Sequence, residues 1–259
     1  MAPEAERRTL AVPSHAIASQ AWWPALHTTI NEAYLSRDVA AIPKSWGRLN
    51  SDPKLGAASF VNELGPKGHL AIIFLDDRPI ACSGFLPFRG ENWILEAQEP
   101  GSSTELEGGE LTSRDPPEQA TEFKEYIPDW EVCCFCVHPE QRRSGLSRLL
   151  VETLISAIQP RGAKRLIANY SPEETGEFWP NKMGFTTPVG SGTVLRKGFK
   201  FAPEAEGLRE DLHFLVTYVR APKQHSLLAL IGSGRSRPTT GRPDIMNSGV
   251  CQAAAWLHG

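Results

Sequence analysis

Three cysteines lie within four positions of one short stretch, EVCCFCVHPEQRRSGLSRLL at residues 131–150. A structural zinc site needs cysteines on a turn and a second pair of ligands, and a thiol redox site needs Cys-x-x-Cys at the start of a helix. This stretch instead has the pattern of a buried strand, along which side chains alternate between the two faces. We therefore expect Cys133 on one face, Cys134 and Cys136 on the other, and no metal site. Cysteine is also a common buried residue, so these three are predicted to line the core.

The segment that follows this strand could bind an anion. The strand is expected to end at Val137, and an amphipathic helix is expected over 145–159. The N–H groups and the dipole at a helix start attract anions, and Gly145 lets a ligand approach the backbone closely. Arg142 and Arg143 add positive charge. The segment is either a cradle for a pyrophosphate or an arginine-rich surface turn.

The elements that must position these residues follow from periodicity and turn signals, and together they indicate a mixed α/β domain. Two helices are expected within 20–38, after Pro24, and from Asp52-Pro53 to Gly65. Strands at 69–77 and 80–88 form a hairpin. The remaining elements are a strand at 130–137, the helix at 145–159, a strand at 164–170, a short helix at 173–184, and strands within 185–200 and 211–220.

Two segments break this pattern. Residues 89–128 are rich in Gly, Pro, Ser and acids and form a long loop, and residues 221–259 have little periodicity. We therefore expect one domain over 9–222 with an acidic insertion at 89–128, and a poorly ordered tail at 223–259.

Charge is unevenly distributed along the chain. Of a net charge of −3, residues 91–131 carry −10, from twelve acids against one Lys and one Arg, so the rest sums to +7. Such asymmetry indicates that one region meets a cation and another an anion, although a solvated acidic loop would look the same. We find no nucleic-acid-binding motif and no single basic face, so no nucleic-acid partner is expected.

Length and composition indicate the class of protein. The 259 residues are 41% hydrophobic, enough for a sizeable core without disulfides or metal. No apolar run approaches the roughly 18–20 residues of a membrane helix, and the N-terminus does not resemble a secretory signal. An odd count of five cysteines suits a reducing compartment, so a cytoplasmic protein without a membrane partner is expected.

Two motifs together resemble those of the GNAT superfamily of N-acetyltransferases. The cofactor motif [QR]-x-x-G-x-[GA] corresponds to Arg142-Arg143-Ser144-Gly145-Leu146-Ser147, with Ser in place of the final Gly or Ala. The second motif, F-Y-x-K-x-G-F, corresponds to FWPNKMGF at 178–185. The resemblance covers roughly residues 9–220. It implies a GNAT-like, mostly antiparallel central sheet with flanking helices and a splayed strand pair, with acetyl-CoA as co-substrate.

The resemblance also implies roles for individual residues. The pantetheine arm of acetyl-CoA would pair with the strand backbone near Val137, and its pyrophosphate would bind the N–H groups of Arg142, Arg143, Ser144, Gly145, Leu146 and Ser147. The helix at 173–182 would cover the CoA arm. Asn169, at the end of its strand, would contact the cofactor or simply form a turn.

Catalysis requires that an amine lose a proton and that the CoA thiolate leave. The family position for a general base is occupied by Glu131, which alternation would place on one face with Cys133, Phe135 and Val137. It could equally be the last acid of the acidic segment. The family tyrosine that protonates the thiolate is missing, because Trp179 or Pro180 takes its place. Tyr170 is a more distant candidate, and the thiolate could also leave to water.

The resemblance therefore implies transfer of an acetyl group from acetyl-CoA to an amine by direct attack. The acids and aromatic residues of the insertion favour a small cationic metabolite as acceptor. Acetylation of protein lysines or N-termini, and a non-catalytic module that binds acyl-CoA, are the alternatives. The sequence does not indicate an oligomeric state.

Overall fold

A computed structural model describes residues 6–90, 128–190, 192–200 and 205–220. The predicted acidic insertion, apart from its ends, and the predicted tail lie outside these residues. In the described part, the strands are β1 (Arg7–Pro13), β2 (His69–Leu75), β3 (Arg78–Pro87), β4 (Asp129–Val137), β5 (Arg165–Tyr170), β6 (Thr187–Pro188), β7 (Thr193–Leu195) and β8 (Leu212–Arg220). The α-helices are α1 (Trp23–Leu35), α2 (Pro53–Leu64), α4 (Leu146–Ile158) and α5 (Pro172–Thr175).

These strands form one sheet in the order β1-β2-β3-β4-β5-β8-β6, with β7 also paired to β8. All neighbouring strands are antiparallel except β4 and β5, which are parallel. The α/β class, the hairpin and the mostly antiparallel sheet are therefore confirmed. The edge strand β1 was not predicted, because Arg7, Arg8 and Thr9 are exposed and give the segment little apolar pattern.

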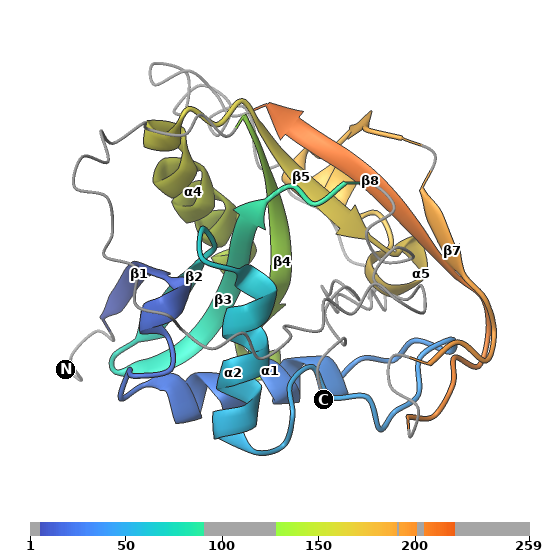
Figure 1. The fold of residues 1–259 in the computed structure, drawn as a ribbon, viewed down its shortest axis with the longest axis horizontal. Helices are drawn as coiled ribbons and strands as arrows, with labels where there is room; N and C mark the ends of the chain where they lie inside the picture. The colour runs from blue at the N-terminus through green and yellow to red at the C-terminus, as the bar shows by residue number, and fades with distance from the viewer. Residues whose placement is uncertain (1–5, 91–127, 191, 201–204, 221–259) are drawn as a thin grey trace, which may run out of the picture.

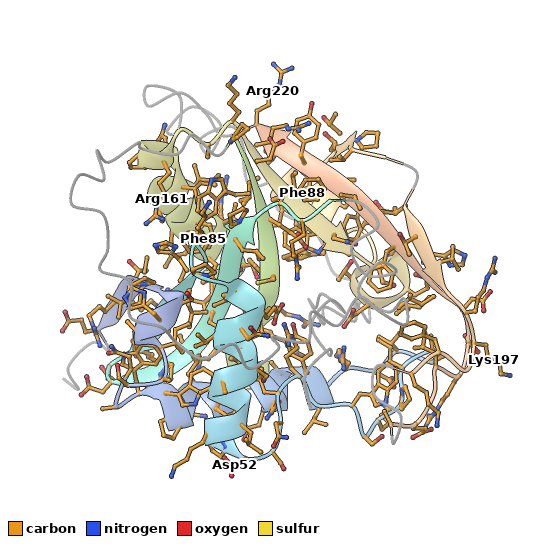
Figure 2. All side chains as sticks on the ribbon, in the orientation of Figure 1. Asp52, Phe85, Phe88, Arg161, Lys197 and Arg220 are labelled. Carbon is orange, nitrogen blue, oxygen red and sulfur yellow. The ribbon has the colours of Figure 1, made fainter. Side chains whose placement is uncertain are left out.

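Helix boundaries follow from local chemistry. The Asp52 carboxylate accepts hydrogen bonds from the N–H groups of Lys54 and Leu55 at 2.7 and 3.3 Å, which caps α2 as its Asp-Pro start predicts. Figure 2 labels Asp52 at that end of the helix. The short helix expected at 173–184 is instead broken by Gly176, whose φ is +53°. It becomes α5 followed by a π-helical turn at Phe178–Lys182.

A bulge in β4 overturns the expected alternation of the cysteines. Cys136 pairs with Cys82 and Cys133 pairs with Gly84, so two residues of β4 face one residue of β3. Cys134 lies in this bulge with a φ of +45°. As a result, all three cysteines of β4 pack in the same core cluster, with α1 and α2, whereas Phe135 and Val137 belong to the cluster around α4. The alternation prediction was therefore wrong, although the cysteines are buried as expected.

The two core clusters lie on opposite faces of the sheet. One is formed by α1 and α2 against β1–β4, and the other by α4 against β2–β5. At the far end of α4, Arg161 lies beside the second cluster, and its guanidinium carbon is 5.7 Å from the centre of a Trp130 ring. Figure 2 labels Arg161 near Phe85 of β3, on that part of the sheet.

The parallel strands β4 and β5 separate along their length. Their pairing runs from Asp129 opposite Arg165 to Val132 opposite Ala168 and goes no further in the described residues. Figure 1 shows the strands side by side at one end and diverging toward the other. The predicted splayed pair is therefore present.

A second connection joins the β1–β4 part and the β5–β8 part of the sheet at the end where β4 and β5 are apart. Arg37, which follows α1, donates from Nη1 to Oε1 of Glu174 in α5 at 2.9 Å, and both side chains are buried. Next to this ion pair, apolar residues of the loop between α1 and α2 pack against β7, β8 and the segment that joins them. The two parts of the sheet are therefore joined where β4 and β5 are apart as well as where these strands pair.

Candidate active site

A pocket of about 260 Å³ opens where β4 ends and α4 begins. Its lining consists of the loop between these elements, the first turn of α4 and the π-helical turn. The lining residues are Val137, Gln141, Arg142, Arg143, Gly145, Leu146, Ser147, Arg148, Phe178, Lys182 and Met183. All but two of the eight predicted cofactor-binding residues, Ser144 and Asn169, line it.

The loop backbone is shaped to present N–H groups. Arg143 and Gly145 have φ angles of +67° and +82°, and Gly145 directly precedes α4. The first N–H groups of a helix have no intrahelical acceptor, so those at the start of α4 are available to a ligand. A Cβ atom built on Gly145 would meet no atom within 4 Å, which shows open space beside the backbone there. Ser144 is exposed, and its hydroxyl donates to the Gln141 carbonyl at 2.5 Å.

The lining of the pocket is positively charged. Among the residues that the structure describes, it contains Arg142, Arg143, Arg148 and Lys182 and no acidic residue. Arg142 also holds the loop against α1. Its Nη2 donates to the Ser36 hydroxyl at 2.7 Å and to the Ala33 carbonyl at 3.1 Å. A polyanion in the pocket would therefore meet a cationic, N–H-rich surface.

The pocket leads to the splay. Val137 lines the pocket and pairs with Ala81 of β3 on one side. On its other side, β4 beyond Val132 has no strand partner among the described residues. An extended ligand with amide groups can pair with such a strand edge, because unpaired N–H and C=O groups there need partners.

Asn169 lies on β5 where it diverges from β4. Its side chain is fully buried, and neither its Oδ1 nor its Nδ2 has a hydrogen-bond partner in the described structure. Leaving buried polar atoms unpaired is costly, so this amide points to an absent ligand. The register places Asn169 on the same face as Ile167 and hence Glu131, which pairs with Ile167.

Glu131 is fully buried and paired with Arg89, which follows β3. Arg89 Nη2 donates to Oε1 at 2.7 Å, and Arg89 Nε donates to Oε2 at 3.1 Å. Burial pulls the pKa of Arg89 down, but the Glu131 charge and hydrogen bonds outweigh it and raise that pKa overall. Sequence reasoning missed this arginine, because the two residues are 42 positions apart and nothing local links them.

Tyr170 lies on the other face of the sheet from Glu131, in the α4 cluster. Burial raises the pKa of Tyr170, and the Thr217 side chain offsets part of that rise. Its ring centre is 6.2 Å from that of Trp179, and Trp179 also lies 5.2 Å from Phe135 of β4. The tryptophan in the motif position of the missing tyrosine therefore packs between the two diverging strands.

Other kinds of site have no counterpart in the described residues. No group of three or more His, Cys, Asp or Glu side chains there is arranged to hold a metal ion. Likewise, the helices in this part of the chain are all too short or too polar to cross a membrane.

Comparison with known proteins identifies the family. Residues 23–185, more than half of the chain, match the model of the acetyltransferase (GNAT) family. The chain therefore belongs to this family and is an acetyltransferase with acetyl-CoA as its co-substrate. No curated protein matches the chain closely enough to count as a relative.

Solved structures with a similar arrangement share little sequence with this chain. An N-acetyltransferase from Staphylococcus aureus Mu50 has a TM-score of 0.48 at 10% identity, with 84% of this chain and 100% of that chain covered. A Salmonella typhimurium structure described with its cofactor acetyl-CoA has a TM-score of 0.45 at 15% identity, with 85% and 96% covered.

The residues present fit acetyl-CoA. The cationic pocket at the start of α4 suits a pyrophosphate, and the β4 edge beyond Val132, which has no strand partner in the described part of the chain, suits the amides of a pantetheine arm. Asn169, whose amide has no hydrogen-bond partner there either, lies on β5 just past the last residue paired with β4. When bound, acetyl-CoA supplies a thioester whose carbonyl carbon accepts a nucleophile.

Proposed function

We propose that this enzyme transfers the acetyl group of acetyl-CoA to the amine of a small, cationic metabolite. The observation that carries the proposal is the cationic pocket that leads into the splay beside Asn169, Val137 and Glu131. In this proposal the backbone N–H groups of 142–147 hold the pyrophosphate, and Asn169 holds the pantetheine arm. Placement in the cytoplasm stays a prediction.

Glu131 is proposed as the general base. The acceptor nitrogen must lose a proton as it bonds to the acetyl carbon, and a positioned carboxylate that takes this proton contributes about 10²–10⁴-fold to rate. The leaving sulfur takes a proton from water or from Tyr170, which stays a candidate. Tyr170 and Glu131 lie on opposite faces of the sheet, so the proton donor and the base would reach the reacting atoms from opposite sides of the splay.

The preference for a cation rests on the acidic sequence at 91–131, most of which lies outside the described residues. Acids there would attract a positively charged acceptor and concentrate it near the site. Acetylation of a basic peptide uses the same attraction and is the related alternative.

The second candidate function is an acyl-CoA-binding module without turnover. Two observations favour it: both carboxylate oxygens of Glu131 accept hydrogen bonds from Arg89, and the tyrosine of the family motif is replaced. Such a module would bind acetyl-CoA in calorimetry but would release no CoA when an amine is added.

The test is a screen of amines with acetyl-CoA, with CoA release measured by chromatography. Polyamines and other cationic amines are expected to be acetylated, neutral amines of similar size much less, and Glu131→Gln should abolish most turnover without weakening acetyl-CoA binding. Acetylation of neutral amines alone would refute the cationic acceptor. Absence of acetyl-CoA binding would refute the cofactor site itself.

A further inference from the structure

The Arg89–Glu131 pair is a buried, two-pronged ion pair beside the splay. Side-chain exposure is 0% for Glu131 and 21% for Arg89, so the carboxylate is fully buried and its partner is partly exposed. The Arg89 backbone N–H also points to Oε2, at 3.5 Å. Phe88, which precedes Arg89, is labelled in Figure 2, and its N–H donates to the Asp129 carbonyl of β4 at 3.1 Å. The arginine is therefore anchored to the strand that carries Glu131.

Other charged groups face this pair from α2, from the loop before α2, and from β4. Glu63 of α2 acts on Arg89 and itself pairs with buried Arg48 at 2.6 Å. Cys133 of β4 is also close, but burial raises the pKa of its thiol well above the usual value, with Glu63 acting in the same direction. The thiol is therefore neutral, and among the described residues Arg48 and Arg89 face Glu63 and Glu131.

A buried carboxylate without a counter-charge binds a proton tightly, because desolvation disfavours its charged form. A protonated Glu131 could not take a proton from an amine. The two hydrogen bonds from Arg89 leave capacity, because a carboxylate oxygen can accept more than one. Among the described residues Oε1 accepts a single hydrogen bond, from Arg89, and keeps a free lone pair.

We propose that Arg89 is the positioning residue that keeps Glu131 ionised and aims Oε1 at the acceptor amine. This inference rests on the proposed function, in which Glu131 is the base. The amine proton passes to Oε1 as the nitrogen–carbon bond forms and the carbon–sulfur bond breaks. The thiolate takes a proton from water, and Glu131 later returns its proton to solvent, with Arg89 unchanged throughout.

The test compares rate against pH for wild type, Arg89→Met and Arg89→Lys with one acetylated amine. Arg89→Met should lose about 10²-fold or more in kcat near neutral pH, and its acid limb should move up by at least one pH unit, with recovery in alkali. Arg89→Lys keeps the charge and should keep the acid limb near that of wild type. The KM for acetyl-CoA should change little in both.

Arg165→Met is the matched control. It removes another arginine–carboxylate pair of the same strand, since Arg165 Nε donates to Asp129 at 2.7 Å, but at the paired end of β4. Its acid limb should match that of wild type. A loss that is uniform across pH in Arg89→Met, or a limb that moves equally in the control, would overturn the inference.

Glu131→Gln separates this inference from the proposed function. If Glu131→Gln turns over at the wild-type rate, the base itself is wrong. If it is inactive but Arg89→Met keeps the wild-type limb, only the role of Arg89 is wrong. Should Arg89→Met not fold, Arg89→Lys decides alone: a full loss of kcat, with no recovery in alkali, would overturn the proposal.

Discussion

Replacing Gly145 by Glu tests the cofactor pocket by placing a negative charge where a pyrophosphate is expected. The substitution has two separable effects, backbone strain and charge. Comparison with Gly145→Gln isolates the charge, because the two new side chains have nearly the same size.

The structure gives the size of each effect. The φ of +82° at Gly145 is left-handed, which costs an L-residue about 1–2 kcal/mol. No atom lies within 4 Å of the new Cβ, so this cost is strain rather than a clash and falls on folding for both variants alike. For the charge, a separation of about 6 Å and an effective dielectric of about 20–40 give roughly 1.4–2.8 kcal/mol per phosphate charge. Gly145→Glu should therefore bind acetyl-CoA about 10- to 100-fold more weakly than Gly145→Gln.

The assay is calorimetric titration of acetyl-CoA into each variant, with thermal unfolding measured in parallel. Gly198→Glu is the matched control, since Gly198 has a φ of +83° and equally open surroundings but does not line the pocket. The control should lose stability like Gly145→Glu and keep wild-type affinity. The difference between the Glu and Gln variants should shrink at high salt. A folded Gly145→Glu protein with wild-type affinity would refute the assignment of the pocket.

Three further predictions concern other sites. Asn169→Leu should leave the unfolding temperature unchanged or raise it, because it removes unpaired polar atoms that cost about 1–3 kcal/mol, but calorimetry should show weaker acetyl-CoA binding; the reverse pattern would contradict its role. Arg37→Met should destabilise the fold by about 3–5 kcal/mol in urea unfolding, with much of the loss recovered in Arg37→Met/Glu174→Gln; equal stability of the single and double variants would argue against the pair. Burial and the Arg161 charge lower the pKa of His69 below 6.5, so its contribution is complete above pH 6.5 and is lost as pH falls through its lower folded value. The unfolding temperature should drop over that range in wild type and drop less in His69→Gln.

Elements with strong local signals could be predicted from the sequence. The hairpin, α2 with its Asp52 cap, and α4 with its apolar stripe all lie within a residue or two of their expected bounds. The loop before α4 was found because Gly and Arg residues precede an amphipathic helix. In each case the deciding contacts are between residues close in the chain.

Features decided by distant contacts could not be predicted. The bulge at Cys134 depends on the register with β3, and no residue type in β4 marks it. The partner of Glu131, Arg89, lies 42 residues away at the opposite end of the predicted insertion, and nothing in the sequence links the two residues. Arg142 was expected at the cofactor, but its contacts with Ala33 and Ser36, which are 109 and 106 residues away in the sequence, arise only when the loop before α4 meets the end of α1.

The double tie across the splay has a kinetic consequence. The strands β4 and β5 lie side by side at one end, where their backbones pair (Figure 1). At the other end, the Arg37–Glu174 pair and its neighbouring apolar residues join the same two parts of the sheet. Because both ends are joined, we expect the two parts of the sheet to separate little when a ligand binds. An extended ligand would then enter and leave beside the pocket at the start of α4, so we expect its residence time to depend on movements of the loop before α4 and of the π-helical turn.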